Sequence, residues 1–166
     1  MVRGSFPTLN DGVLANNWPT VGASRGKFLF AMEGNATDDY LAGHPSLQGR
    51  AMFLITKPGL PESAVIGEDV PDSFQTRIKD EVAKGYIVRT RADETNQENR
   101  TGDFSRQVAA FASGAQMIST DYYRADPRYL TDPKFKNYSC KFPNGELARI
   151  NPVSAADKQG IGIIAE

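Results

Sequence analysis

The sequence predicts an α/β fold built on a parallel sheet, and three observations support that prediction. Residues 84–88 are mostly apolar and lead directly into the charged segment 89–94. Further along the chain, the stretch 114–119 leads in the same way into the polar segment 120–123. A helical segment lies between them, and this order is typical of a βαβ unit, whose strands are parallel. Because binding side chains gather at the carboxyl ends of such strands, we expect a site at the two polar segments that follow them.

The composition is that of an ordinary globular domain. Of the 166 residues, 40% are hydrophobic and 23% are charged, which suffices for one domain with a core. The formal net charge of −1 lacks the basic excess that is typical of nucleic-acid-binding proteins. No apolar run approaches the roughly 20 residues of a membrane span, and no signal peptide opens the sequence. A single cysteine, Cys140, excludes an internal disulfide.

The first quarter of the chain predicts a short helix and a strand. Residues 8–17 have apolar residues at helical spacing and begin at Thr8, a good N-cap residue. Trp18-Pro19 then ends the helix. The stretch 26–32 is apolar on both faces, which predicts a central, parallel strand that ends at residues 33–35.

The next elements are a helical turn, a second strand and a longer helix. The turn is expected at 38–41 and the strand at 51–55, followed by a long irregular link. The helix begins at Asp72 or Ser73, and Gly85 lies just beyond its end, where glycine is preferred. Its apolar stripe consists of Phe74, Ile78 and Val82.

The second half of the chain predicts two more strands separated by a helix. The third strand is expected at 86–88 and the fourth at 117–119. The helix between them begins at Thr101 or Asp103 and is closed by Gly114, and only turn signals follow the fourth strand. We expect the aromatic residues at helical spacing to face the core: Phe74, Phe104 and Phe111.

Four parallel strands are half of an eight-stranded barrel, which typically needs roughly 250 residues. We therefore expect residues 1–166 to form a single domain with the strand content of half of such a barrel. Half of a closed barrel leaves open sheet edges and an uncovered face, so self-association is expected unless an amino-terminal half covers them.

Arg89 and Arg91 are the first candidate binding residues. Strand alternation places both on one face and Thr90 on the other. Because arginine is always charged and binds phosphate bidentately, either side chain could hold a phosphate group. The alternative is a structural salt bridge to one of three nearby carboxylates, which are Asp93, Glu94 and Asp121.

Polar residues after the other strands complete the candidate site. Glu33 and Asn35 follow the first strand, and their oxygen atoms could bind sugar hydroxyls or a hard cation, or they could cap the loop. Lys57 follows the second strand and could meet a phosphate as a point charge, or it could simply be solvated. Asp121 and Tyr122 follow the fourth strand, and a carboxylate with a phenol suits sugar recognition.

Several motifs, in the same order along nearly the whole chain, resemble the second half of the calcium-dependent phosphoinositide-specific phospholipase C family of bacteria and fungi. Thr-Asp-Tyr after a buried strand also resembles the last strand of glycerophosphodiester phosphodiesterases. The motifs that carry the resemblance are Trp18-Pro19-Thr20, Arg25-Gly26-Lys27-Phe28-Leu29-Phe30, Thr90-Arg91-Ala92-Asp93, Arg100-Thr101-Gly102-Asp103, Gly114-Ala115-Gln116, Ser119-Thr120-Asp121-Tyr122 and Ala148-Arg149-Ile150-Asn151-Pro152.

The resemblance implies that residues 1–166 are the carboxyl-terminal half of a longer (β/α)8 barrel. It implies that the complete barrel cleaves phosphoinositide to diacylglycerol and inositol phosphate. It also implies calcium as the cofactor of the complete barrel, phosphoinositide or inositol phosphate as the partner, and secretion as in bacterial relatives. Family members carry catalytic histidines and calcium ligands in the first half of the barrel. This chain has a single histidine, His44, in a loop before Pro45, so we assign it no catalytic residue and no metal ligand. The alternatives are a non-catalytic half-barrel that binds a polyol phosphate and a glycerophosphodiester phosphodiesterase-like enzyme.

Overall fold

Five strands form the sheet of the computed structural model, which describes residues 2–34, 36–94, 96–142, 145–146 and 148–158. The strand order is β1-β2-β3-β4-β5, so each strand lies beside the one that precedes it in the sequence. The pairings β1–β2, β2–β3 and β4–β5 are parallel. The predicted α/β class and the arrangement of half of a (β/α)8 barrel are confirmed. The strands are β1 (Ala31–Met32), β2 (Phe53–Thr56), β3 (Val65–Gly67), β4 (Ile87–Arg91) and β5 (Met117–Ser119).

Helices and single helical turns connect these strands. Across the part of the chain that the structure describes, no helix combines the length and apolar character needed to cross a bilayer. The α-helices are α1 (Leu9–Leu14), α2 (Val21–Ser24), α3 (Thr37–Leu41), α4 (Pro71–Ala83), α5 (Gln97–Thr101) and α6 (Ser105–Ser113). The 3-10 turns are η1 (Pro45–Leu47), η2 (Pro127–Leu130) and η3 (Ala156–Lys158).

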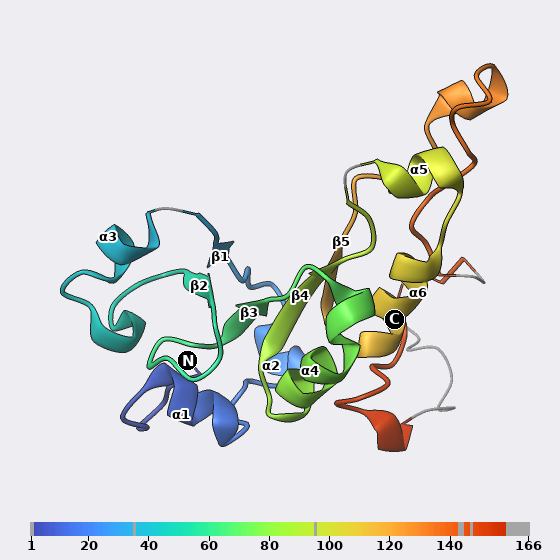
Figure 1. The fold of residues 1–166 in the computed structure, drawn as a ribbon. Coiled ribbons are helices and arrows are strands. Elements are labelled where there is room, and N and C mark those ends of the chain that lie inside the picture. The colour runs from blue at the N-terminus through green and yellow to red at the C-terminus, as the bar shows by residue number, and fades with distance from the viewer. Residues whose placement is uncertain (1, 35, 95, 143–144, 147, 159–166) are drawn as a thin grey trace. The chain divides into compact units, whose positions relative to one another are not determined.

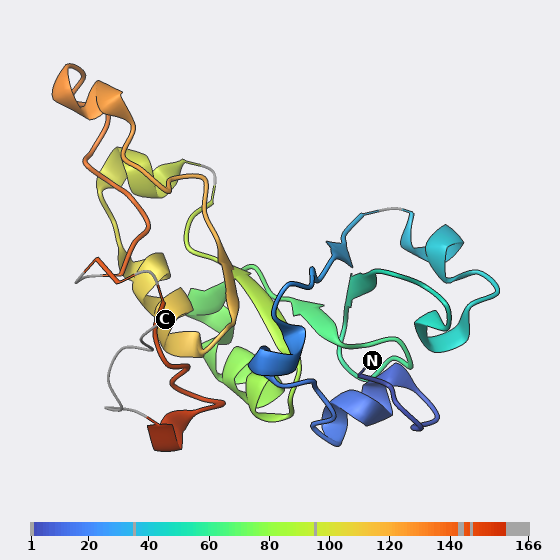
Figure 2. The same cartoon turned by 180° about the vertical axis from the view of Figure 1, so that it is seen from behind.

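The chain divides into two compact units. Unit 1 consists of Met1–Gly67 and Asp80–Val88, and unit 2 consists of Glu68–Lys79 and Arg89–Glu166. Within unit 1, β1 lies beside β2, and within unit 2 the last part of β4 lies beside β5, as Figures 1 and 2 show from opposite sides.

The first helix of unit 1 forms where its cap predicts. The Thr8 hydroxyl accepts from the Asp11 N–H, and the Asp11 carboxylate accepts from the Thr8 N–H, so a capping box closes the amino end of α1. Val13, on the buried face of α1, lies so near Gly85 that a Cβ there would be 2.8 Å from the Val13 carbonyl oxygen. Gly85 also has a φ of +100°, and both facts require the glycine that the sequence places after α4.

The predicted first strand is wrong in extent and in burial. Only Ala31–Met32 pairs with β2, although the apolar run covers residues 26–32. Phe28 is 87% exposed and Phe30 is 58% exposed, so the run is not a central strand. Because β1 is the end strand of the sheet order, its ladder has a partner on one side only, and apolar periodicity cannot reveal that difference.

This exposed apolar segment leads to a prediction of self-association. We expect the purified chain to form concentration-dependent oligomers, because an end strand beside exposed aromatic rings offers both backbone and apolar contacts. The double variant Phe28→Ser/Phe30→Ser should be mostly monomeric in light scattering, whereas Val108→Ser, at a residue that is 63% exposed in α6, should behave like the wild type. A monomeric wild type across all concentrations would contradict the prediction.

The predicted irregular link contains a fifth strand that the sequence analysis missed. Strand β3 pairs with β2, with Val65 opposite Ile55 and Ile66 opposite Thr56. Val65 and Ile66 are buried, so β3 carries part of the core in only three residues. A run this short, bounded by a polar loop and Gly67, gives no periodicity to detect.

The later elements agree with the sequence, apart from two aromatic side chains. Helix α4 buries Ile78 and Val82 as predicted, and β5 lies at 117–119 as predicted. Gly114 ends α6 with a φ of +78°, and a Cβ there would lie 2.5 Å from the Val153 side chain. Phe74 and Phe104 are not core residues, because they are 41% and 40% exposed at the amino-terminal ends of their helices.

Candidate functional site

Strand β4 presents its two arginines on one face, as the alternation predicts. Val88 and Thr90 are fully buried. Arg89 and Arg91 alternate with them, lie on the opposite face and are partly exposed. Because β5 pairs with β4 in parallel, with Arg91 opposite Ser119, the loops after both strands emerge next to Arg91 within unit 2.

The two arginines have different surroundings. A guanidinium nitrogen of Arg89 lies 2.5 Å from a carboxylate oxygen of Asp69, and the Arg89 side chain is 19% exposed. This short ion pair holds Arg89 against the segment that precedes α4. The nearest oxygen of Asp121 lies 3.6 Å from the Arg91 guanidinium, which is an ion pair but too long for a hydrogen bond. Arg91 therefore keeps N–H donors that Asp121 does not occupy.

Asp121 and Tyr122 follow β5 and lie differently in the loop. The Asp121 side chain is 67% exposed, so its carboxylate is accessible to a ligand. The Tyr122 hydroxyl donates to the side-chain oxygen of Asn96. The Tyr122 ring packs edge-on against the Tyr138 ring, with the two ring centroids 5.6 Å apart. Partial burial, followed by the negative charges of Asp93 and Asp121, raises the pKa of Tyr122, so this phenol is neutral at pH 7.

Three further side chains shape this site: Arg106, Asp93 and Thr120. The sequence analysis gave none of them a binding role. Arg106, on α6, lies 2.6 Å from the Glu94 carboxylate and also donates to the Asp69 carbonyl oxygen. Asp93 is fully buried just after β4 and accepts from the Thr120 hydroxyl, in the loop after β5. The sequence analysis offers Asp93 only as a salt-bridge partner. Its other role depends on its burial, which a single sequence does not show.

The remaining predicted residues belong to unit 1. Glu33 directly follows β1 and Lys57 directly follows β2, and both side chains are exposed. Since β1 and β2 are parallel neighbours, both residues come at the carboxyl ends of their strands, as predicted. Asn35 lies outside the described residues. The binding roles of these three residues stay predictions.

The single histidine belongs to a local turn of unit 1. The Nδ1 atom of His44 lies 2.7 Å from the carbonyl oxygen of Gln48, so this nitrogen carries the proton and donates it. His44 precedes the 3-10 turn η1, whose first residue is Pro45. The contact fixes the ring to its own loop.

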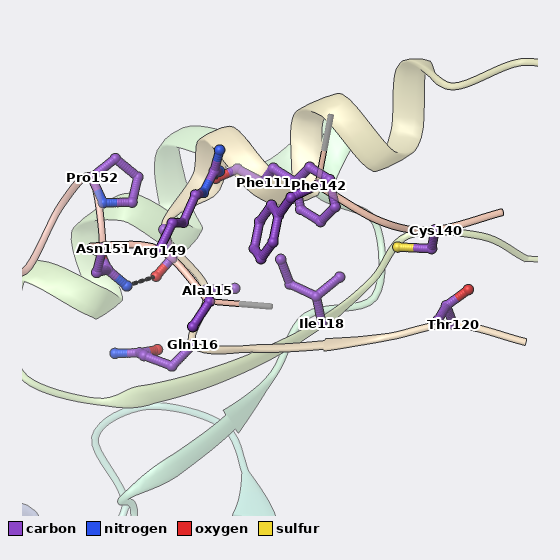
Figure 3. Close-up of a pocket in the computed structure, with 12 residues that line it drawn as sticks. Phe111, Ala115, Gln116, Ile118, Thr120, Cys140, Phe142, Arg149, Asn151 and Pro152 are labelled. Carbon is purple, nitrogen blue, oxygen red and sulfur yellow. Dashed lines mark hydrogen bonds between the residues drawn. The ribbon is translucent and has the colours of Figure 1, made fainter. Parts of the chain in front are cut away.

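A cavity of about 490 Å³ in unit 2 is mostly lined by apolar groups (Figure 3). Its walls include the rings of Phe111 and Phe142, whose centroids are 4.7 Å apart, and the Arg149 guanidinium lies over both rings. Two of its polar side chains bind backbone carbonyl oxygens: the Asn151 amide donates to that of Gly114 at 2.6 Å, and the Arg149 guanidinium donates to that of Phe111. The lining is therefore mainly apolar and aromatic, around the guanidinium of Arg149.

Cys140 lies in the wall of this cavity, and we expect its thiol to react slowly with thiol-labelling reagents. Burial and the charge of Asp93 raise the pKa of the thiol to about 11, from an ordinary 9.0, although a bond with Thr120 lowers it. At pH 8 its thiolate fraction should be on the order of a hundredfold below that of the unfolded chain. Timed labelling with a thiol reagent, native and in urea, measures this ratio, and equal rates would contradict the prediction. Because the neutral thiol is favoured, its contribution to stability is present below pH 9 and is lost as the pH rises toward 11.

A calcium ion does not fit the side chains that the structure describes. Calcium takes about six to eight oxygen ligands, usually from several carboxylates. Within the described ranges no group of three or more histidine, cysteine or acidic side chains is placed to hold a metal ion. The acidic groups near β4 are instead engaged with arginines, as in the pairs of Asp69 with Arg89 and of Glu94 with Arg106. No step of the chemistry is therefore assigned to a metal bound by these residues.

Comparison with known protein families gives a match over most of the chain. The family model described as "Phosphoinositide phospholipase C, Ca2+-dependent" matches residues 1–152. The matched range contains every residue of the candidate site. Neither the curated proteins nor the solved structures that were compared gave a match to this chain.

Proposed function

This chain belongs to the calcium-dependent phosphoinositide phospholipase C family, and we propose that it supplies the part of such an enzyme that binds the inositol phosphate headgroup. The reaction class is phosphodiester cleavage of a phosphoinositide to diacylglycerol and an inositol phosphate. The observation that carries the proposal is the placement of Arg91 beside Asp121, at the carboxyl ends of two paired strands, with Tyr122 following Asp121 in the chain.

Arg91 is the proposed phosphate ligand. Its side chain is 28% exposed and its pairing with Asp121 is loose, so it can turn toward an anion without leaving a carboxylate buried and unpaired. A guanidinium binds two phosphate oxygens at once and stays charged at any physiological pH. Arg89 is less suitable, because releasing it would break the 2.5 Å contact with Asp69.

Asp121 and Tyr122 are the proposed inositol ligands. The exposed Asp121 carboxylate can accept hydrogen bonds from two neighbouring hydroxyl groups of the ring. The neutral Tyr122 phenol offers an aromatic face, held by its contacts with Asn96 and Tyr138. Carbon-bound hydrogens of a sugar-like ring pack against such a face.

Binding is only one part of the reaction. By the 2-hydroxyl route, the inositol oxygen forms a bond to phosphorus while the bond to the diacylglycerol oxygen breaks. That exchange needs a proton acceptor at the hydroxyl and a proton donor at the leaving oxygen. Arg91 would stabilise the charge on the phosphate oxygens, and Asp121 would orient the ring. These two roles do not supply the proton acceptor and the proton donor. The proposal therefore assigns substrate binding to these residues and no proton transfer.

The direct test is calorimetric titration of the purified chain with myo-inositol 1-phosphate. Because the site is partly exposed, we expect a dissociation constant on the order of 1 mM at low salt, weakening as salt is added. Glycerol 1-phosphate and inorganic phosphate are the comparison ligands. Equal affinity for glycerol phosphate would favour the glycerophosphodiester alternative, and no heat with any of the three ligands would contradict a headgroup site.

A further inference from the structure

Asp93 is a charged side chain with no access to solvent. It lies just after β4, with 0% of its surface exposed. Burying a carboxylate is costly unless donors satisfy its oxygens. Across the described residues Asp93 forms no ion pair, so the donors around it must be neutral groups.

Both oxygens of Asp93 bind the loop that follows β5. One accepts from the Thr120 hydroxyl, and the other accepts from the Asp121 backbone N–H at 2.9 Å. The Thr120 oxygen in turn accepts from the Tyr122 N–H at 2.9 Å. A single buried carboxylate thus ties three consecutive residues of the loop to the end of β4.

We propose that Asp93 is the positioning residue of the headgroup site, holding Asp121 and Tyr122 in register with Arg91. Arg91 and Asp93 are separated only by Ala92, which is itself fully buried, so the two move as one rigid piece of chain. The Asp121 amide is fixed to the same piece, and the spacing between Arg91 and Asp121 follows from it. Because Asp93 is buried and its oxygens are occupied, it acts through its neighbours and does not contact the ligand. The inference rests on the proposed function.

Three titratable side chains lie close enough to Asp93 to be affected by its carboxylate: Tyr122, Tyr138 and Cys140. After burial, its negative charge is the next cause that raises the pKa of Tyr122, and also of Tyr138 and Cys140. The raised pKa values keep these three groups neutral at pH 7. The Thr120 hydroxyl and the Asp121 N–H are two neutral donors from one loop, so the carboxylate acts as a clamp for that loop.

Two substitutions of Thr120 test the clamp while leaving Asp93 in place. Thr120→Val removes the hydroxyl but keeps the shape, whereas Thr120→Ser keeps the hydroxyl. We expect Thr120→Val to weaken binding of myo-inositol 1-phosphate by about tenfold to a hundredfold, since small displacements of binding groups carry effects of that size, and Thr120→Ser to restore it. Asp93→Ala should weaken binding at least as much, and Asp80→Ala, at an exposed residue of α4, should leave it unchanged.

Amide hydrogen exchange at Asp121 supplies a readout that does not depend on the ligand. We expect the Asp121 N–H to be protected in the wild type and in Thr120→Ser, and to exchange faster in Thr120→Val and Asp93→Ala. If Asp93→Ala fails to fold, the two Thr120 variants decide. Equal binding, or equal exchange, in Thr120→Val and Thr120→Ser would overturn the positioning role. If the wild type binds no inositol phosphate, the proposed function fails, and the exchange data alone decide whether Asp93 holds the loop.

Discussion

Replacing Arg91 by alanine is expected to abolish measurable binding of inositol phosphate while leaving the fold intact. One charge-assisted pairing contributes about 1.5–3 kcal/mol, so its loss weakens binding by about tenfold to a hundredfold. From a starting affinity on the order of 1 mM, the remaining binding would produce no usable heat. The fold should survive because Arg91 is partly exposed and its partner Asp121 is 67% exposed, so no charge is left buried. Calorimetric titration and thermal melting measure the two effects separately.

Two other arginines serve as controls for this experiment. Arg77, on α4, is 48% exposed and pairs with Glu68 at 3.2 Å, so Arg77→Ala removes the same charge at a residue outside the proposed set of ligands. We expect it to bind like the wild type. Arg89→Ala should instead lower the melting temperature, because Asp69 loses a 2.5 Å partner. Binding that is unchanged in Arg91→Ala, or lost equally in Arg77→Ala, would remove Arg91 from the site.

The parts of the fold that local chemistry determines could be predicted from the sequence. Thr8 closes the first helix because its hydroxyl and the Asp11 carboxylate form a capping box within one turn. Gly85 and Gly114 end helices because both take positive φ values, which other residues avoid. The shared face of Arg89 and Arg91 follows from the two-residue period of a strand. Each of these features depends on residues that are close in the sequence.

Features that depend on distant parts of the chain could not be predicted in the same way. Apolar residues in 26–32 suggested a central strand, but β1 has a neighbour on one side only, so most of that run stays exposed. Strand β3 has only three residues, and its pairing with β2 defines it as a strand. Arg89 was given three candidate partners, all later in the sequence, yet it pairs with Asp69, which lies before α4. Ion-pair partners are set by tertiary distance, and a single sequence does not contain it.

The purified chain, supplied with calcium and phosphatidylinositol vesicles, is expected to release no inositol phosphate above the uncatalysed background. Positioned proton transfer typically contributes about 10²–10⁴-fold to such a cleavage, and it requires an acceptor and a donor on opposite sides of the phosphate. The chain has one histidine, His44, whose Nδ1 is engaged with Gln48 at 2.7 Å. A calcium-dependent phospholipase C of known activity, assayed on the same vesicles, serves as the positive control.

Calcium-dependent release by the chain alone would contradict this expectation, and two further measurements would then locate the proton acceptor. If His44→Ala abolished the release, His44 would be the acceptor after all, through its second ring nitrogen. If Asp121→Asn abolished it instead, the exposed carboxylate beside Arg91 would combine orientation with proton transfer. Binding without turnover is the result that agrees with the site as it is built: one loosely paired arginine for the phosphate, and one exposed carboxylate and one phenol for the ring.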